Sequence, residues 1–127
     1  MTQGFRGLKV YQKSYEMVKV IYAESAKFPK EEQYGIIIQI RRASVSVALN
    51  IAEGYGRKLN PLDYRSFLII SKGSCNEMQV LTELCRDLGY ITSNRCDEIT
   101  GNYDEISRML EGLIKSLTTS TNKLKDT

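Results

Sequence analysis

The sequence predicts an all-α protein, an antiparallel four-helix bundle connected up-down-up-down. Apolar residues recur at alternating steps of three and four along most of the chain, which is the spacing of one face of an α-helix. Proline and glycine interrupt this pattern at three places and leave only short connections. Because a short connection turns each helix back beside the previous one, sequential helices should be antiparallel neighbours. The 127 residues suit one domain, spanning 1–127, with its own core.

The first helix is expected over about residues 8–27. Its heptad-spaced seam consists of Leu8, Tyr11, Tyr15, Val18 and Tyr22. Ser14, Met17 and Ile21 widen the apolar side of this helix. The helix should end before Pro29, because proline disfavours helical geometry in the residue that precedes it.

The second helix is expected over about residues 31–54, and a glycine of Gly54-Tyr55-Gly56 should end it in a left-handed cap. The third is expected over about 61–88, with Asn60 as its N-cap and Pro61 in its first turn. Its seam consists of Tyr64, Phe67, Ser71, Ser74, Met78, Leu81, Cys85 and Leu88. Gly73 beside these small serines predicts a tight helix crossing, since an unpacked glycine costs a helix about 1 kcal/mol.

The fourth helix is expected over about residues 94–119, after Gly89 has ended the third. Its seam consists of Cys96, Ile99, Tyr103, Ile106, Leu110, Leu113 and Leu117. The polar tail, residues 118–127, should fray, because chain ends with few apolar residues are weakly held.

A polar stripe on the second helix is the most informative pattern in the chain. The stripe consists of Gln39, Arg42, Ser46, Asn50 and Glu53, which fall within one arc of a helical wheel. One apolar flank consists of Ile36, Ile40, Ala43, Val47 and Ile51, and the other of Ile38, Val45, Leu49 and Ala52. A helix with two apolar flanks needs cover for both, one in its own bundle and one against a partner.

Three interpretations of the stripe remain open at this point. Its residues could form a hydrogen-bonded network between helices, which must be satisfied where it is buried. They could instead line a contact between identical subunits. In a third interpretation Glu53 acts as a catalytic acid or base, although it has no second acid or histidine to work with.

Composition argues against most catalytic chemistries. The chain has no histidine, which excludes imidazole-based triads and the Glu-x-x-His pairs of di-iron bundles. Its three cysteines, Cys75, Cys85 and Cys96, form no CxxC pair and are expected to act as small core residues. We expect no enzyme, no metal and no cofactor. No stretch has the length of a membrane span or a signal peptide, so a cytoplasmic protein without membrane contacts is expected.

The net charge of +3 is concentrated in the first half of the chain. A solvated lysine-rich surface and a nucleic-acid surface both fit this mild asymmetry. The candidate nucleic-acid contacts are Lys9, Lys13, Arg41, Arg57, Lys58, Arg65 and Lys72. Such side chains would bind phosphates, with little readout of base sequence.

Several separated motifs resemble one protein family in the same order. They are Phe5, Leu8, Tyr11-Gln12, Phe28-Pro29, Glu32, Tyr34-Gly35, Gln39-Ile40-x-Arg42-Ala43, Ser46, Asn50-Ile51-Ala52-Glu53-Gly54, Phe67, Gly73-Ser74, Glu77 and Leu88-Gly89-Tyr90-Ile91. Over about residues 5–117, the chain resembles the four-helix-bundle proteins encoded in intervening sequences of bacterial 23S ribosomal RNA genes. The resemblance implies a ring-shaped homopentamer. It also implies similarity to the accessory protein of diversity-generating retroelements, a basic pentamer that binds nucleic acid and a reverse transcriptase.

These observations together predict a non-enzymatic homopentamer that binds RNA or DNA through phosphate contacts. The alternative is a scaffold that recruits another protein and has no direct role with nucleic acid.

Overall fold

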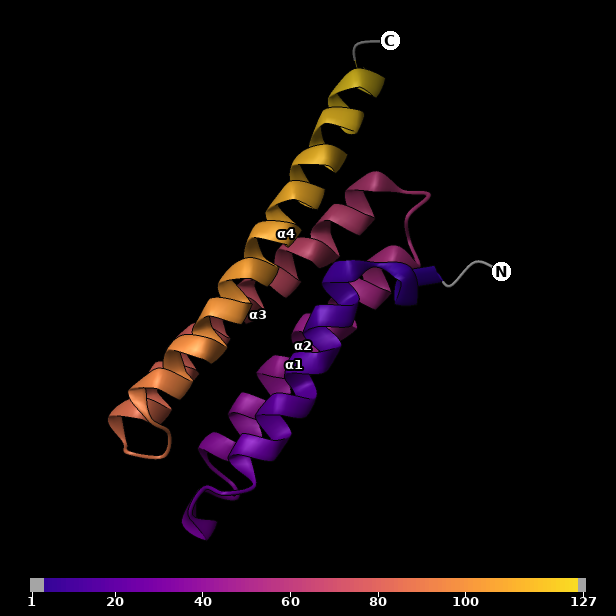
Figure 1. Ribbon diagram of the computed structural model, residues 1–127. Helices are drawn as coiled ribbons and strands as arrows, with labels where there is room; N and C mark the ends of the chain where they lie inside the picture. The colour runs from indigo at the N-terminus through magenta and orange to yellow at the C-terminus, as the bar shows by residue number, and fades with distance from the viewer. Residues whose placement is uncertain (1–3, 126–127) are drawn as a thin grey trace.

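The computed structural model describes residues 4–125 and contains four long helices (Figure 1). They are α1 (Lys9–Ser25), α2 (Ile36–Tyr55), α3 (Pro61–Asp87) and α4 (Ser93–Lys125). Two short 3₁₀ helices, η1 (Gly4–Gly7) and η2 (Lys30–Glu32), precede α1 and α2. No strand occurs among residues 4–125, so the predicted all-α class is confirmed.

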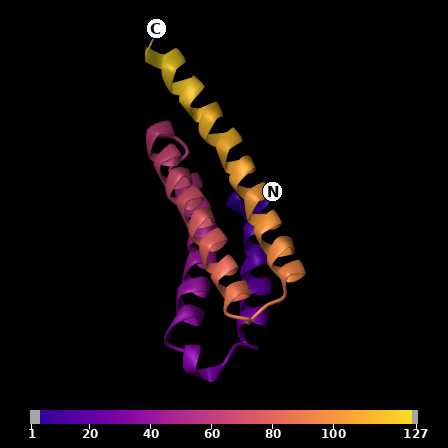
Figure 2. The ribbon, with the colours of Figure 1, turned by 90° about the vertical axis from the view of Figure 1, so that its left-hand side faces the viewer.

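Each long helix packs against its neighbours in the chain, and α1 also contacts α4 (Figure 1). Hydrogen bonds tie Gln79 of α3 to Thr100 of α4, and Arg65 of α3 to Thr118 of α4. The partner numbers rise as the α3 numbers fall, so these two helices are antiparallel. Figure 2 shows that the C-terminal end of α4 projects beyond the start of α3.

The start of α2 differs from the prediction of residue 31. Residues 30–32 form η2, in which Glu32 N–H donates to the carbonyl of Pro29 at 3.0 Å. Gly35 then adopts φ −112° and ψ −115°, which is outside the helical region, and α2 begins at Ile36. The connection is anchored to the far end of α3 because the Tyr90 hydroxyl donates to Glu32 Oε2 at 2.6 Å.

The fourth helix is longer than the predicted 94–119, and fraying of the polar tail stays a prediction. Helix α4 continues to Lys125 instead of ending near 119, while Asp126 and Thr127 lie outside the described residues. The hydroxyls of Thr118 and Thr119 donate to the carbonyls of the residues four positions earlier, at 2.9 and 3.0 Å. These polar side chains therefore satisfy themselves on the helix and do not terminate it.

The expected seam of α1 is only partly confirmed: Leu8 and Tyr11 pack against the core, but farther along the helix the Met17 side faces inward. Val10, Met17 and Ile21 are buried, whereas Tyr15 is 50% and Tyr22 is 44% exposed. The small Ser14 is fully buried because its hydroxyl donates to its own helix. At these half-exposed positions the Tyr15 and Tyr22 hydroxyls can hydrogen-bond to water.

The core is continuous through the four helices and includes all three cysteines. Large side chains that are fully buried include Ile51, Leu68, Met78, Tyr103 and Leu110. Burial raises the pKa of the Cys75 thiol to about 12 and that of Cys85 to about 11. Thiols in this state stay protonated near neutral pH and are poor nucleophiles, which agrees with the expectation that they act as core residues.

The tight crossing lies between α2 and α3, but Gly73 does not make it. A Cβ atom at Gly54 would lie 2.9 Å from Phe67 Cβ and 3.3 Å from the Tyr64 carbonyl oxygen. The Ser71 hydroxyl donates to the Val47 carbonyl across the same contact at 2.8 Å. Around Gly73, by contrast, no described atom lies within 4 Å of a built Cβ.

Glycine Gly54 is therefore required for close helix approach, and the expected left-handed cap at this turn is wrong. The C-cap residue Gly56 has φ −62°, a right-handed helical value. Among residues 4–125, positive φ occurs only at Gly4 and Gly89. Gly89, with φ +81°, ends the third helix as the sequence predicts.

Candidate nucleic-acid interface and subunit contact

The middle of the polar stripe forms a hydrogen-bonded link between α2 and α3. The Asn50 amide donates to the Ser46 carbonyl at 2.8 Å and to Ser46 Oγ at 3.0 Å. Ser46 Oγ in turn lies 2.8 Å from Ser74 Oγ on α3. These three side chains agree with the interpretation of the stripe as a network between helices.

The remaining stripe residues, Gln39, Arg42 and Glu53, face solvent at the α2 surface. None of their side chains has a hydrogen bond or ion pair within the described part of the chain. No second acid or base is bonded to the Glu53 side chain among the described residues. Two of the five stripe residues therefore link α2 to α3, and the other three form polar surface.

The two apolar flanks of α2 have opposite environments. The inner flank, Ile36, Ile40, Ala43, Val47 and Ile51, is buried in the bundle. The outer flank remains uncovered: Ile38 is 48%, Val45 37% and Leu49 56% exposed. We call these three side chains the outer ridge.

A hollow of about 510 Å³ lies along the outer ridge, between it and the side chains of Tyr22, Arg41 and Arg42. The neighbouring helix α3 also exposes Ile69, Ile70, Val80 and Leu84. Exposed apolar side chains along a helix that lacks a neighbour there are typical of an interaction surface.

Four of the seven candidate cations are engaged within the bundle. Lys13 of α1 contacts Asn102 and Glu105 of α4, each at 2.9 Å. The remaining three contacts are Arg41 to Ser25 Oγ at 2.8 Å, Arg65 to Thr118 Oγ1 at 2.9 Å, and Lys72 to Glu111 at 2.5 Å. The Lys72 ammonium lowers the pKa of the Glu111 carboxyl. These contacts tie helices together. Carboxylates partly neutralise Lys13 and Lys72, whereas Arg41 and Arg65 bind neutral hydroxyls and keep their charge.

The other three candidates, Lys9, Arg57 and Lys58, are exposed at one end of the bundle. The start of α1 and the loop between α2 and α3 both lie at this end (Figure 1). Arg57 lies over the Phe67 ring at 4.9 Å, and Lys58 lies over the Tyr55 ring at 4.4 Å. Neither they nor Lys9 form an ion pair with a described carboxylate.

Arg6 was not among the sequence candidates, but it lies at the same end. It belongs to η1, which packs on α1 and α2, and its guanidinium lies 4.6 Å from the Phe5 ring centre. It too has no carboxylate partner within residues 4–119. In the sequence, the place of Arg6 next to Phe5 and just before the first helix could have indicated a further candidate cation. We call Arg6, Lys9, Arg57 and Lys58 the basic end.

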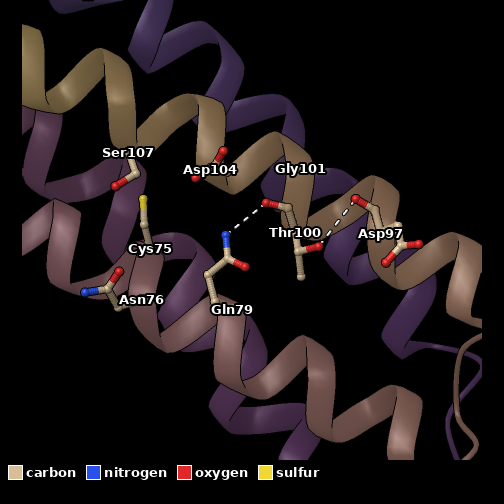
Figure 3. A pocket seen from close by; sticks show the side chains of 8 residues that line it. All are labelled: Cys75, Asn76, Gln79, Asp97, Thr100, Gly101, Asp104 and Ser107. Atoms are coloured by element: carbon tan, nitrogen blue, oxygen red, sulfur yellow. Dashed lines mark hydrogen bonds between the residues drawn. The ribbon is translucent and has the colours of Figure 1, made fainter.

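A polar groove between α3 and α4 offers different chemistry (Figure 3). In this groove of about 390 Å³, Gln79 donates to the Thr100 carbonyl at 2.9 Å, and Asp97 and Asp104 lie along the α4 side. Two carboxylates would repel a phosphate chain. No group of three or more potential metal ligands occurs in the described residues. Its described lining, with two carboxylates on the α4 side, therefore does not favour a phosphate ligand.

None of the helices described here is long and apolar enough to cross a membrane. The family model described as 23S rRNA-intervening sequence protein matches residues 6–112. The chain belongs to this family. The match covers both the basic end and the whole of α2, and it confirms the resemblance seen in the sequence motifs.

A solved structure supports the family's fold. The chain is similar to a crystal structure of a protein of unknown function from the S23 ribosomal protein family of Bacteroides thetaiotaomicron. The two share 26% identity with a TM-score of 0.76, over 84% of this chain and 98% of the other. No curated protein matches the chain. Neither the family nor the solved relative carries an assigned activity.

Proposed function

We propose that this member of the 23S rRNA-intervening sequence family is a non-enzymatic homopentamer that binds RNA or other nucleic acid through phosphate contacts. The observation that supports nucleic-acid binding is the basic end. Its cations, Lys9, Arg57 and Lys58 with Arg6, share one end of the bundle and lack carboxylate partners among the described residues. Cations that are not neutralised within the protein remain free to replace the counterions of a phosphate backbone.

Assembly would strengthen this modest charge. A chain of net charge +3 would carry +15 as a pentamer, with the basic ends repeated around the ring. Linked subunits that each make weak phosphate contacts bind one nucleic acid more tightly than a single subunit does, because each further contact becomes intramolecular.

The outer ridge supports self-association. Ile38, Val45 and Leu49 form an apolar surface on the helix whose opposite flank is already buried. The polar side chains beside it, Arg42 and Glu53, have opposite charges and no partner within residues 4–119. A second copy would supply both an apolar cover and complementary charges, and we assign the ridge to the subunit contact.

The proposal is tested by measuring light-scattering mass and salt-dependent binding of labelled RNA together. We expect a mass near five subunits, and an affinity that falls steeply as salt rises from about 50 to 200 mM. The double variant Arg57→Gln/Lys58→Gln should weaken binding and lower the salt slope. Its matched control is Lys27→Gln/Lys30→Gln, which removes two lysines at the opposite end. Equal effects of both variants, or binding that is insensitive to salt, would contradict the assignment.

A protein-recruiting scaffold is the second candidate function, and the same outer ridge favours it. An exposed apolar surface can be covered by a different protein as readily as by a second copy. Nuclease treatment distinguishes the two candidate functions, because it releases partners that are held only through nucleic acid. Partners that stay bound after nuclease treatment, on a protein that remains a single chain, would favour the scaffold.

A further inference from the structure

A hollow beside α1 combines aromatic rings with cations. It measures about 660 Å³ and is lined by Arg6, Tyr11, Gln12, Tyr15 and Glu16. Tyr15 is half exposed, and its ring centre lies 6.0 Å from that of Tyr11 with a tilt of 35°. We call this site the tyrosine hollow.

The walls of the hollow are held in place by contacts within the protein. Phe5 packs edge-on against Tyr11, with ring centres 4.9 Å apart. The Gln12 amide donates to the Arg6 carbonyl at 2.8 Å and so fastens η1 to α1. Rings that are positioned before a ligand arrives lose little conformational entropy when it binds.

Cations accompany the rings on both sides of the hollow. Arg6 lies over Phe5 at 4.6 Å, and Lys19 lies over Tyr15 at 5.5 Å. Among the described residues, Glu16 is the one carboxylate that lines the hollow, and it is paired with Lys19 at 2.8 Å. The hollow is therefore an aromatic surface with a positive border that is partly offset by Glu16.

We propose that the tyrosine hollow binds an unpaired base of a single-stranded nucleic acid, which stacks on Tyr15, while the adjoining phosphates contact Arg6 and the basic end. The proposal rests on the function proposed above and specifies the kind of nucleic acid. Aromatic rings beside cations are the combination that single-strand-binding proteins use, because every base has a face that can stack. The bases of an intact duplex are stacked on one another and cannot reach the ring.

The tyrosine hollow is distinct from the proposed subunit contact. Its residues lie on η1 and α1, whereas the outer ridge lies on α2. Arg6 belongs to both the hollow and the basic end, so a strand could pass from the phosphate contacts to the stacking site without crossing the ridge. The same oligomer could therefore hold several single-stranded segments at once.

The test compares three labelled ligands of equal length by fluorescence anisotropy at one low salt concentration. They are a mixed-sequence single strand, a strand of abasic sites with the same number of phosphates, and the duplex of the mixed sequence. Tyr15→Leu should weaken the base-containing single strand by about tenfold, the typical loss of one stacked base. It should leave the abasic strand and the duplex unchanged.

Two further variants sharpen the result. Tyr15→Phe retains the ring and should bind all three ligands as the unmodified protein does. Glu16→Gln removes a carboxylate from the hollow. It should strengthen binding of both single strands, because the carboxylate repels the phosphates that both strands carry.

Each failure has its own signature. In one outcome the abasic and base-containing strands bind equally, Tyr15→Leu changes neither affinity, and Arg57→Gln/Lys58→Gln weakens both. This outcome would overturn the stacking site and leave phosphate binding intact. A change in light-scattering mass caused by Tyr15→Leu would overturn it by placing the hollow in a subunit contact. Absence of binding to all three ligands would overturn both this inference and the proposed function.

Discussion

The two flanks of α2 are built from the same kinds of residue, yet only one of them is covered. Val47 and Ile51 on the inner flank are fully buried among the other helices. Leu49, between them in sequence, is 56% exposed on the outer ridge. Burial of an apolar side chain of this size is worth about 1.5–3 kcal/mol, so the outer ridge leaves a comparable gain unused in the single chain.

The difference separates what holds one chain together from what can hold several together. The inner flank stabilises the bundle in any state of assembly. The outer ridge adds stability only when something covers it, and this contribution must depend on the concentration of the partner. Matched substitutions on the two flanks therefore test the structure and the proposed assembly separately.

The largest expected effect is at the inner flank. Ile51→Ala should lower the free energy of unfolding by about 2–5 kcal/mol, because it leaves a cavity in the core. Leu49→Ala should lower the free energy of unfolding of a single chain by less than about 0.5 kcal/mol, since it removes exposed surface. Denaturant unfolding of both variants at several protein concentrations measures the two effects.

For Ile51→Ala the loss should not change with concentration, and for Leu49→Ala it should. A loss from Leu49→Ala that is large and independent of concentration would mean that the ridge is covered within the chain.

Two glycines give the next largest contrast, on the inner and outer sides of the α2–α3 pair. Gly54→Ala should destabilise the protein by about 1–3 kcal/mol, because the new Cβ would press on Phe67 and the Tyr64 backbone. Gly73→Ala should stabilise a single chain by up to about 1 kcal/mol, because the position is open and alanine favours the helix. Thermal unfolding of dilute protein checks both signs. Destabilisation of the single chain by Gly73→Ala would show that another part of the chain packs there.

A smaller contrast compares the hydrogen bonds of Asn50 in the polar stripe with the ion pair of Lys13 at the surface. Asn50→Leu removes two hydrogen bonds to Ser46 and should cost about 1–2 kcal/mol or disturb assembly. Lys13→Ala removes a partly exposed contact with Glu105 and should cost less than about 1 kcal/mol. Unfolding and light-scattering mass are measured for both variants. Equal and negligible changes would argue against a structural role for the polar stripe.

The smallest expected effect is a pH dependence of stability. It arises from an ion pair between α3 and α4, and substitutions on the outer ridge should show none. The pKa of Glu111 in the folded protein is lowered by its bond to Lys72, so the pair stabilises the fold above the ordinary carboxyl pKa. That contribution is lost as the pH falls through the lowered pKa. The difference in melting temperature between the unmodified protein and Glu111→Gln should therefore shrink in acid. Leu49→Ala, which changes no charge, should show no such dependence, and a constant difference for Glu111→Gln would contradict the role of the ion pair.

Much of the fold could be predicted from the sequence because helix formation is largely local. Asn60 accepts a hydrogen bond from the Asp63 N–H at 3.3 Å and begins α3, as its position before Pro61 predicts. The inner flank of α2 and most of the α4 seam are buried where the spacing places them. The sequence also identified the outer flank as apolar, although it could not say whether the bundle covers it.

The faces that meet and the cations that stay exposed depend on contacts between helices, which spacing along one helix does not reveal. Spacing on α1 placed the tyrosines and the Met17 side on one broad face, and packing buried only the latter. Lys13 and Lys9 are equivalent in the sequence, yet Lys13 finds Glu105 on α4 while Lys9 remains exposed. Periodicity describes side chains on a single helix, but burial and ion pairing depend on residues that are distant in the chain and close in space. For that reason the helices of this protein follow from its sequence pattern, whereas the places of its proposed functional surfaces follow from how the helices pack.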